Sequence, residues 1–470
     1  MNQTTTQTTY LYLVSFVAAV GGFLFGYDLS IISGALPFLT KHFALDAAGE
    51  GWATSSAILG AILGPLAGVW LADAVGRRMT LAIAALCFMT SAIGTAIPQT
   101  FAQFVFWRMV GGVGVGLAAV ISPMYIAEIA PAHLRGRLVT VNQLAIVIGI
   151  NLAVIASYLL SFGGHWRWMF ASEALPILFL MVGLFFVPES PRWLAAKKRG
   201  REALAVLTRI NGPAQANKEL GEIQEELKEE SGTFRELFQP GIRLALLIGI
   251  VIMIFSQVNG VNMMLLYGPT ILVEAGIGTT SDAIFFTIFL NLVILVSTLI
   301  AFWLVKIFGR REILIGGVLV MALGHLAMAV TFFLKASALL NLVAMFLAAG
   351  AFTLSLAPLS WVIVSEIFPN QIRGKAVSIV CCILYLASFI CAQYFPMLTE
   401  AFQKGMGHPG GAYLLFAAIC VSCALFTWRV VPETKGLTLE EIGLFWLKRT
   451  GGGREQAVGS GSGQLSKGKG

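Results

Sequence analysis

The chain has 470 residues, of which 57% are hydrophobic and 12% charged, and its formal net charge is +7. This composition excludes an ordinary soluble globular protein and is typical of a helical membrane protein. The positive charge does not indicate nucleic-acid binding, because the basic residues are confined to alternate loops.

The chemical motifs of enzymes and pumps are missing from the sequence. No GxxxxGK[ST] loop is present, and the five histidines have no nucleophile partner nearby, so neither an ATP-driven pump nor a hydrolase is expected. The six cysteines all fall inside apolar runs. Cys420 and Cys423 form a CxxC without a second pair, which favours packing over a metal or redox role. We expect no enzyme activity, metal or cofactor.

Apolar runs of about 20 residues recur along the chain and predict twelve membrane-spanning helices. The first run follows an N-terminus without Lys or Arg, and we interpret it as a retained helix, not a cleaved signal. The predicted spans are 11–34, 51–72, 79–97, 101–127, 138–160, 167–187, 242–270, 281–305, 312–334, 338–365, 375–398 and 411–431.

Charge divides the chain into regions. Nearly all Lys and Arg follow even-numbered spans, precede odd-numbered ones or lie in the C-terminal tail, which predicts that both termini are cytoplasmic. The sequence indicates a six-helix half (1–189), a charged cytoplasmic helical linker (190–238), a second six-helix half (239–432), and a cytoplasmic C-terminal helix and tail (433–470). We expect an integral protein of the inner (plasma) membrane.

Three charged side chains lie well inside predicted spans, away from their ends: Asp28, Arg108 and Glu173. Helical geometry places each of them ~9 to ~10 Å from the same face of the membrane. Charges at such positions are costly and need a partner or a function. We interpret the three as a proton site, in which the distance to Arg108 controls the charge of a carboxyl group. A static, charge-neutralising cluster is the alternative.

Neutral amides lie near the middle of other spans, at Gln143, Gln257, Asn262 and Asn291. An amide both donates and accepts hydrogen bonds, which suits the hydroxyl groups of a sugar, and the ring of Trp361 could stack on a sugar face. Bonds between helices are the alternative role for each amide. Proline in Gly268-Pro269 and Ala357-Pro358 predicts helix bends.

The two halves repeat each other. Glu128 lies seven residues before Arg135-Gly136-Arg137, and Glu366 lies seven residues before Arg373-Gly374-Lys375. Two further pairs occur in the same order at similar offsets: Gly76-Arg77-Arg78 with Gly309-Arg310-Arg311, and Val187-Pro188-Glu189-Ser190 with Val431-Pro432-Glu433-Thr434. A parallel repeat of this kind is typical of a transporter with a site between two rocking halves.

Over residues 10–446 the chain resembles the sugar porter family of the major facilitator superfamily, especially its xylose–proton symporters and facilitative glucose transporters. The motifs that carry the resemblance are FLFGYDLSIISG, GVWLADAVGRR, FWRMVGGVGVG, SPMYIAEIAPAHLRGR, VPESPRWL, SEIFPNQIRGK and VPETKG. The resemblance implies an all-α fold of twelve helices in two pseudo-symmetric halves. It also implies proton coupling, because coupled members carry Asp at the position of Asp28 and facilitative members a neutral residue.

The resemblance assigns roles to further residues. It implies a sugar site formed by Phe25, Gln143, Ile150, Gln257, Asn262, Asn291, Trp361 and Tyr385. It implies an inter-helix salt-bridge latch that closes the cytoplasmic side, formed by Asp73, Arg77, Arg78, Glu128, Arg135, Arg137, Glu189, Arg192, Arg310, Arg311, Glu366, Arg373 and Glu433. The site departs from the family pattern at Ser256, Leu266 and Leu384, which makes it less polar.

The sequence therefore favours secondary transport of a monosaccharide with protons, by a monomer that alternates access across the bilayer. Uncoupled facilitated diffusion of a sugar is one alternative. Another is transport of a less polar substrate, such as a polyol or a small aromatic compound. A non-transporting sugar sensor is disfavoured, because sensors tend to carry long signalling tails and the tail here is short.

Overall fold

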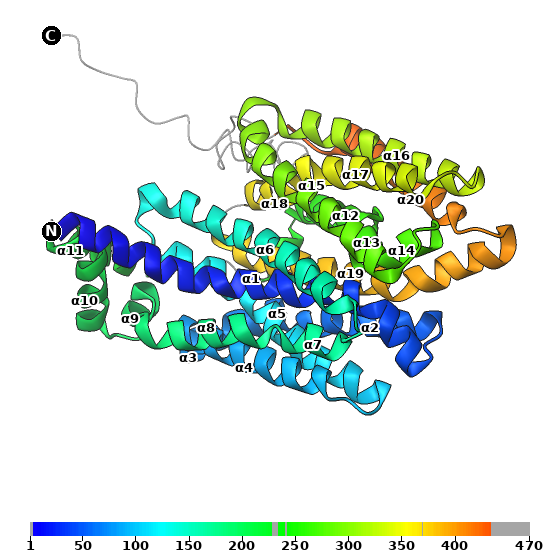
Figure 1. Ribbon diagram of the computed structural model, residues 1–470. Helices are drawn as coiled ribbons and strands as arrows, with labels where there is room; N and C mark the ends of the chain where they lie inside the picture. The colour runs from blue at the N-terminus through cyan, green and yellow to red at the C-terminus, as the bar shows by residue number, and fades with distance from the viewer. Residues whose placement is uncertain (1–2, 228–233, 240–241, 369, 434–470) are drawn as a thin grey trace, which may run out of the picture.

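The computed structural model describes residues 3–227, 234–239, 242–368 and 370–433, which are mostly helical and contain no strand (Figure 1). Twelve segments within them are long and apolar enough to cross a membrane, as predicted. Apart from Glu433, the C-terminal helix and tail predicted at 433–470 lie outside the described residues.

The helices of the two halves follow each other in chain order. The first half contains α1 (Gln3–Phe43), α2 (Ala47–Ala61), α3 (Leu63–Val75), α4 (Arg77–Ala96), α5 (Phe101–Ile129), α6 (Ala132–Ser161), α7 (Trp166–Ala171) and α8 (Ala174–Phe186). The second half contains α12 (Ile242–Val258), α13 (Val261–Leu266), α14 (Gly268–Glu274), α15 (Thr280–Ile307), α16 (Arg310–Phe333), α17 (Ala338–Leu354), α18 (Leu356–Ile367), α19 (Asn370–Met406) and α20 (Gly410–Val430).

Short helices connect the halves. They are α9 (Pro191–Ala196), α10 (Gly200–Asn211), α11 (Pro213–Glu226) and the 3₁₀ helix η1 (Phe234–Phe238). Helices α9 to α11 gather beside the N-terminus at one end of the bundle, on the left of Figure 1. We call this the basic end, because the arginines of the repeated motifs lie there. The opposite end, where α1 stops and α2 begins, is called the far end.

Helix starts at the far end are fixed by capping side chains. Asp46 accepts a hydrogen bond from the main-chain nitrogen of Gly49 at 2.7 Å, and Thr279 accepts one from Asp282 at 3.1 Å. Such caps satisfy amide groups that the first helical turn leaves free. They separate α1 from α2 and begin α15 where the polar loop residues meet the apolar runs.

Several helices extend well beyond their apolar runs. Helix α1 continues to Phe43 instead of stopping near Gly34. At 1.5 Å per residue, Asp28 is therefore ~22 Å from the end of its helix. The predicted ~9 Å is measured to the end of the apolar run, which marks the part of a helix in the bilayer core, whereas the hydrogen-bonded helix continues beyond it.

Glycines allow α1 to pack closely on α6. A Cβ atom at Gly26 would lie 2.1 Å from the main-chain oxygen of Ile146. One at Gly149 would lie 2.1 Å from the oxygen of Phe23. Because only glycine permits this approach, these positions fix how both helices are rotated about their axes.

Helix breaks lie within one turn of both predicted proline sites, and a further break, which was not predicted, lies at Gly260. Gly260, with a φ of 90°, separates α12 from α13, and Asn259 fills the gap by accepting a 2.9 Å bond from the nitrogen of Val261. Helix α14 starts at Gly268, and a second break at Ser355 separates α17 from α18. Pro269 and Pro358 thus sit in first turns, where a missing amide hydrogen is tolerated.

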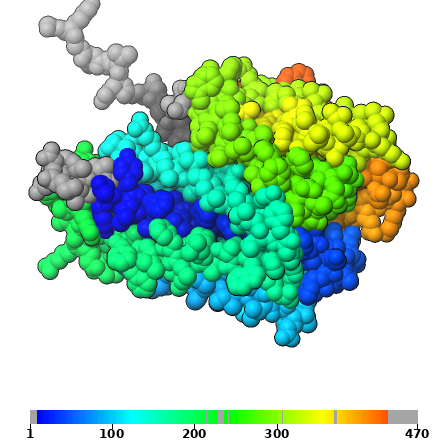
Figure 2. Space-filling view, in the orientation of Figure 1, coloured from blue at the N-terminus to red at the C-terminus, as the bar shows by residue number. Residues whose placement is uncertain are grey.

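The two halves are joined at the far end. Gln393 of α19 accepts a 2.8 Å hydrogen bond from Ser55 of α2 and donates one to the oxygen of Ala48 at 3.2 Å. Ser161 of α6 lies 2.8 Å from Ser281 of α15. Figure 2 shows the two halves as separately coloured masses resting on one another. At the basic end, the ion pairs that the structure describes connect residues of the same half or of its attached short helices.

Candidate functional site

A fully buried ion pair joins α1 to α5. The Nη1 atom of Arg108 lies 2.8 Å from Oδ1 of Asp28, and the two side chains are 0% and 1% exposed. Both terminal nitrogens of Arg108 also lie 3.3 Å from the main-chain oxygen of Asp28. The face of Phe170 covers the guanidinium at 5.7 Å. A buried charge of this kind requires its partner, because neither ion has access to water.

The third predicted charge completes this cluster. Glu173, 1% exposed, precedes α8, and its carboxyl group is close enough to that of Asp28 for the two to interact. No described residue donates to Oδ2 of Asp28 or to Oε1 of Glu173. Two carboxyl groups can share a hydrogen bond only when one of them holds a proton. The predicted grouping of the three residues is therefore present, and its chemistry suits the exchange of a proton.

A cavity of about 260 Å³ lies beside this cluster, between the two halves. Six of the predicted sugar residues line it: Phe25, Ile150, Gln257, Asn262, Trp361 and Tyr385. Leu266 and Leu384, the departures from the family pattern, also line it. One wall of the cavity is formed by α1, through Phe25, Gly26, Leu29 and Ser30. The helix that carries Asp28 therefore lines the cavity.

The break after α12 concentrates polar groups in the cavity. Asn262 donates to the side-chain oxygen of Gln257 at 2.9 Å, and Gln257 donates to the hydroxyl of Ser256 at 3.3 Å. Trp361 is 47% exposed, so much of its ring is free to contact a ligand. Paired amides beside an open aromatic ring can bind the hydroxyl groups and the apolar face of a sugar.

Two predicted sugar residues lie outside this cavity. Gln143 is exposed on α6, and Asn291 is 2% exposed within α15, where it donates to the oxygen of Thr287 at 2.9 Å. The main-chain oxygen of Asn291 accepts a 3.4 Å bond from Asn151, which connects the two halves. In this conformation the amide of Asn291 thus bonds only within its own helix among the described residues, and its side-chain oxygen is buried without a donor.

Sequence reasoning missed the two serines of the cavity, Ser30 and Ser388. Ser388 follows Tyr385 by three residues, so both lie on one face of α19. This spacing could have predicted that Ser388 faces the cavity together with Tyr385. Ser30 follows Asp28 by two residues, and no comparable pattern separated it from the other small residues of α1.

At the basic end of the first half, Arg77 of α4 is bonded to α3, to α5 and to the loop between α8 and α9. It contacts Glu128 at 2.9 and 3.0 Å and Asp73 at 2.9 Å. Glu189 accepts bonds from the main-chain nitrogens of Arg77 at 2.8 Å and Arg78 at 3.2 Å. A Cβ atom at Gly76 would lie 2.3 Å from Glu189, so glycine is needed for this contact.

The second half repeats the arrangement. Glu433 accepts bonds from the main-chain nitrogens of Arg310 and Arg311, each at 3.1 Å. Arg310 lies 3.3 Å from Glu366, and Arg373 donates to the oxygen of Phe368 at 3.1 Å. The sequence repeat thus corresponds to a structural one, with each cluster inside its own half.

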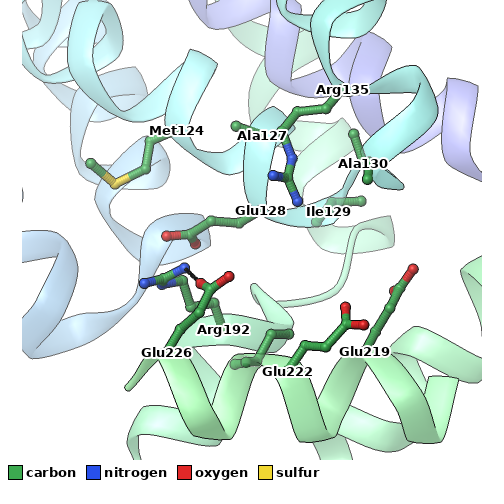
Figure 3. Close-up of a pocket in the computed structure, with 12 residues that line it drawn as sticks. Met124, Ala127, Glu128, Ile129, Ala130, Arg135, Arg192, Glu219, Glu222 and Glu226 are labelled. Atoms are coloured by element: carbon green, nitrogen blue, oxygen red, sulfur yellow. Dashed lines mark hydrogen bonds and ion pairs between the residues drawn. The ribbon is translucent and has the colours of Figure 1, made fainter. Parts of the chain in front are cut away.

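Arg135 and Arg192 line a pocket of about 280 Å³ between α5 and α11 (Figure 3). Arg192 pairs with Glu226 at 2.6 Å. Arg135 points into the pocket, and no described carboxylate lies within 4.0 Å of it. Arg137 is exposed. These three arginines do not join the Arg77 cluster in this conformation.

Comparisons with known proteins agree with this architecture. A family model described as "Sugar (and other) transporter" matches residues 14–446. The chain is 36% identical to the D-xylose-proton symporter of Escherichia coli, covering 94% of this chain and 97% of that protein. It is 37% identical to the arabinose-proton symporter of Bacillus subtilis, covering 93% and 96%. A structure titled as the inward open conformation of the xylose transporter XylE from E. coli matches with a TM-score of 0.82 at 35% identity, covering 93% and 100%.

Proposed function

The chain belongs to the sugar transporter family of the major facilitator superfamily, and we propose that it moves a monosaccharide across the membrane together with a proton. Relatives of similar length are named as proton symporters of xylose and arabinose. The observation that carries the proposal is the position of Asp28, which is buried against Arg108 on the helix that lines the cavity.

In the proposed cycle, the cavity binds the sugar and the buried cluster binds the proton. Gln257, Asn262 and Trp361 hold the substrate, with Phe25 and Tyr385 as apolar and aromatic walls. Movement of α1 relative to α5 changes the distance between Asp28 and Arg108. When the guanidinium is close, it favours the carboxylate, and when it withdraws, the carboxyl group takes up a proton. Glu173 is an accessory acceptor in this scheme.

Alternating access follows from the closure of one end at a time. The hydrogen bonds of Gln393 close the far end here, and the close match to an inward open structure supports the basic end as the open, cytoplasmic side. The positive-inside pattern supports the same orientation. In the opposite state, we propose that the acids and arginines of the two basic-end clusters form the latch between the halves. We propose a single chain in the inner membrane as the working unit.

A second candidate substrate follows from the apolar lining. Leucines and isoleucine form much of the cavity wall, at Leu29, Leu265, Leu266, Leu384 and Ile150. This lining favours a substrate with fewer hydroxyl groups, such as a deoxysugar or a polyol with an apolar edge. A relative at 34% identity is named as a myo-inositol transporter, which supports a polyol.

Uptake into proteoliposomes tests both proposals. Radiolabelled pentoses, hexoses and polyols are offered with and without an inward proton gradient. Coupled sugar transport predicts accumulation above the outside concentration only with the gradient. Equilibration without accumulation would indicate facilitated diffusion, and transport of the polyol alone would support the less polar substrate. No uptake of any of these compounds would contradict the proposal.

A further inference from the structure

A groove of about 550 Å³ opens on the outer surface of the first half, between α4, α8 and α9. None of its lining residues belongs to the substrate cavity. Its position, where two membrane-spanning helices meet the short helices of the basic end, places it at the boundary between the apolar membrane and water.

The lower part of the groove is apolar and faces outward. Met79 of α4 and Phe185 of α8 are 54% and 75% exposed, and Met181 also lines the groove. Exposure of large apolar side chains on membrane-spanning helices means contact with lipid chains. The long, flexible methionines can adapt their shape to an irregular acyl chain.

The upper part of the groove carries cations around a tryptophan. Trp193 donates to the main-chain oxygen of Asp73 at 3.0 Å, which fixes the ring at the top of the groove. The charged groups of Lys197 and Arg199 each lie 5.9 Å from that ring. Tryptophan is enriched at the level of lipid headgroups, where one part of the ring is apolar and the other wet.

The guanidinium of Arg78 has no ion-pair partner among the described residues. No described residue accepts a hydrogen bond from its guanidinium, although the guanidinium lines the groove. Glu189 also lines the groove, but its carboxylate is occupied by the main-chain nitrogens of Arg77, Arg78 and Ser190. Arg199 bonds Glu202 through Nε and Nη2, each at 2.7 Å, which leaves its Nη1 atom for another acceptor. The top of the groove therefore offers Arg78 and this nitrogen of Arg199 to an anion, with the charge of Lys197 beside Trp193.

We propose that this groove is a binding site for an acidic phospholipid. The headgroup phosphate binds Arg78 and Arg199, and one acyl chain lies over Met79, Met181 and Phe185. Arginine suits this role because its planar guanidinium binds phosphate oxygens at two points. The charge of Lys197 disfavours a zwitterionic lipid, whose outer ammonium group it repels. The site is independent of the transported substrate.

Native mass spectrometry of the detergent-solubilised chain tests the site. Phosphatidylglycerol and phosphatidylcholine with identical acyl chains are titrated separately. We expect phosphatidylglycerol to bind at least about tenfold more tightly, because each cation near the headgroup adds to the attraction. The double variant Arg78→Gln, Arg199→Gln should lose this preference.

Two controls separate the groove from general surface charge. Lys41→Gln with Lys218→Gln removes the same charge from the far end and from α11, and should keep the preference. Ala82→Phe fills the apolar floor without changing charge and should lower the affinity for both lipids. Equal binding of the two lipids by the wild type, or equal loss in the charge control, would overturn the proposal. Unchanged binding by Ala82→Phe would also contradict it.

Discussion

Arg108 holds Asp28 at two points, the carboxylate Oδ1 at 2.8 Å and the main-chain oxygen at 3.3 Å. The contact with Oδ1 depends on the charge of Asp28, whereas the longer contact with the main-chain oxygen does not. Movement of α1 relative to α5 would change the carboxylate contact, as the proposed cycle requires. This geometry suits a group that must change state in every transport cycle.

Asp28→Asn should abolish gradient-driven accumulation and leave substrate binding and counterflow exchange largely intact. The amide keeps a hydrogen bond to Arg108 but cannot release a proton. Uptake in proteoliposomes at acidic outside pH, compared with counterflow at equal pH, makes the measurement. If the variant still concentrates substrate against its gradient, Asp28 has a structural role and the proton uses another path.

The pair Asp28→Asn, Glu173→Gln should be much less stable than either single variant. In each single variant one carboxylate still neutralises Arg108, whereas the double variant leaves the buried guanidinium without a counter-charge. Loss of the last partner of a buried charge costs ~3 to ~5 kcal/mol. Thermal unfolding in detergent measures the effect. Additive losses in the double variant would mean that Glu173 does not share the charge of Arg108.

Gln257→Ala and Asn262→Ala should each weaken substrate binding. The loss of one hydrogen bond to a buried hydroxyl costs ~1 to ~3 kcal/mol, which corresponds to a fall in affinity of roughly 5- to 150-fold. Isothermal titration calorimetry with the transported substrate provides the measurement. Gln103→Ala removes an amide at the far end and serves as the control. Normal affinity in both cavity variants would place the substrate elsewhere.

Gln393→Leu should favour opening of the far end. The substitution removes the bond from Ser55 and the bond to Ala48, each worth ~1 kcal/mol, so the equilibrium should shift by roughly tenfold or more. Spin-label distances between α2 and α19 report the opening. Gln403→Leu alters an exposed glutamine of the same helix and should leave the distances unchanged. A shift of similar size in that control would exclude a specific role for Gln393.

Glu366→Gln and Arg135→Gln should favour the conformation that is open at the basic end. Arg135 has no described carboxylate within 4.0 Å here, and Glu366 pairs with Arg310 inside its own half, so both must change partners to join a latch in the opposite state. Their loss removes the bonds of that latch, which form between the halves. Labels on α1 and α12 would record longer distances at the basic end in both variants. Lys218→Gln, an exposed charge of α11, is the control. Unchanged distance distributions in Glu366→Gln and Arg135→Gln would reduce these residues to determinants of topology.

The sequence by itself determined the number of membrane helices and the identity of the buried charges. A helix that crosses a bilayer needs about 20 apolar residues, so each span is visible as a local run. A charge inside such a run is equally visible, and its cost in the membrane indicates a function. Asp28, Arg108 and Glu173 could be grouped in this way because their positions along three helices limit their depth.

The tertiary structure alone decided which polar residues share the cavity. Gln257 and Asn262 line it and Gln143 and Asn291 do not, although all four are amides in apolar spans. What separates them is the rotation of each helix about its axis, and for α6 this rotation is fixed by close contacts such as that between Gly26 and the oxygen of Ile146. The break at Gly260 has a similar origin, because it depends on the space left by Phe416 and His325. Contacts between segments that are distant in the sequence determine both the rotation of α6 and the break at Gly260. These contacts cannot be predicted from the residues of one helix alone.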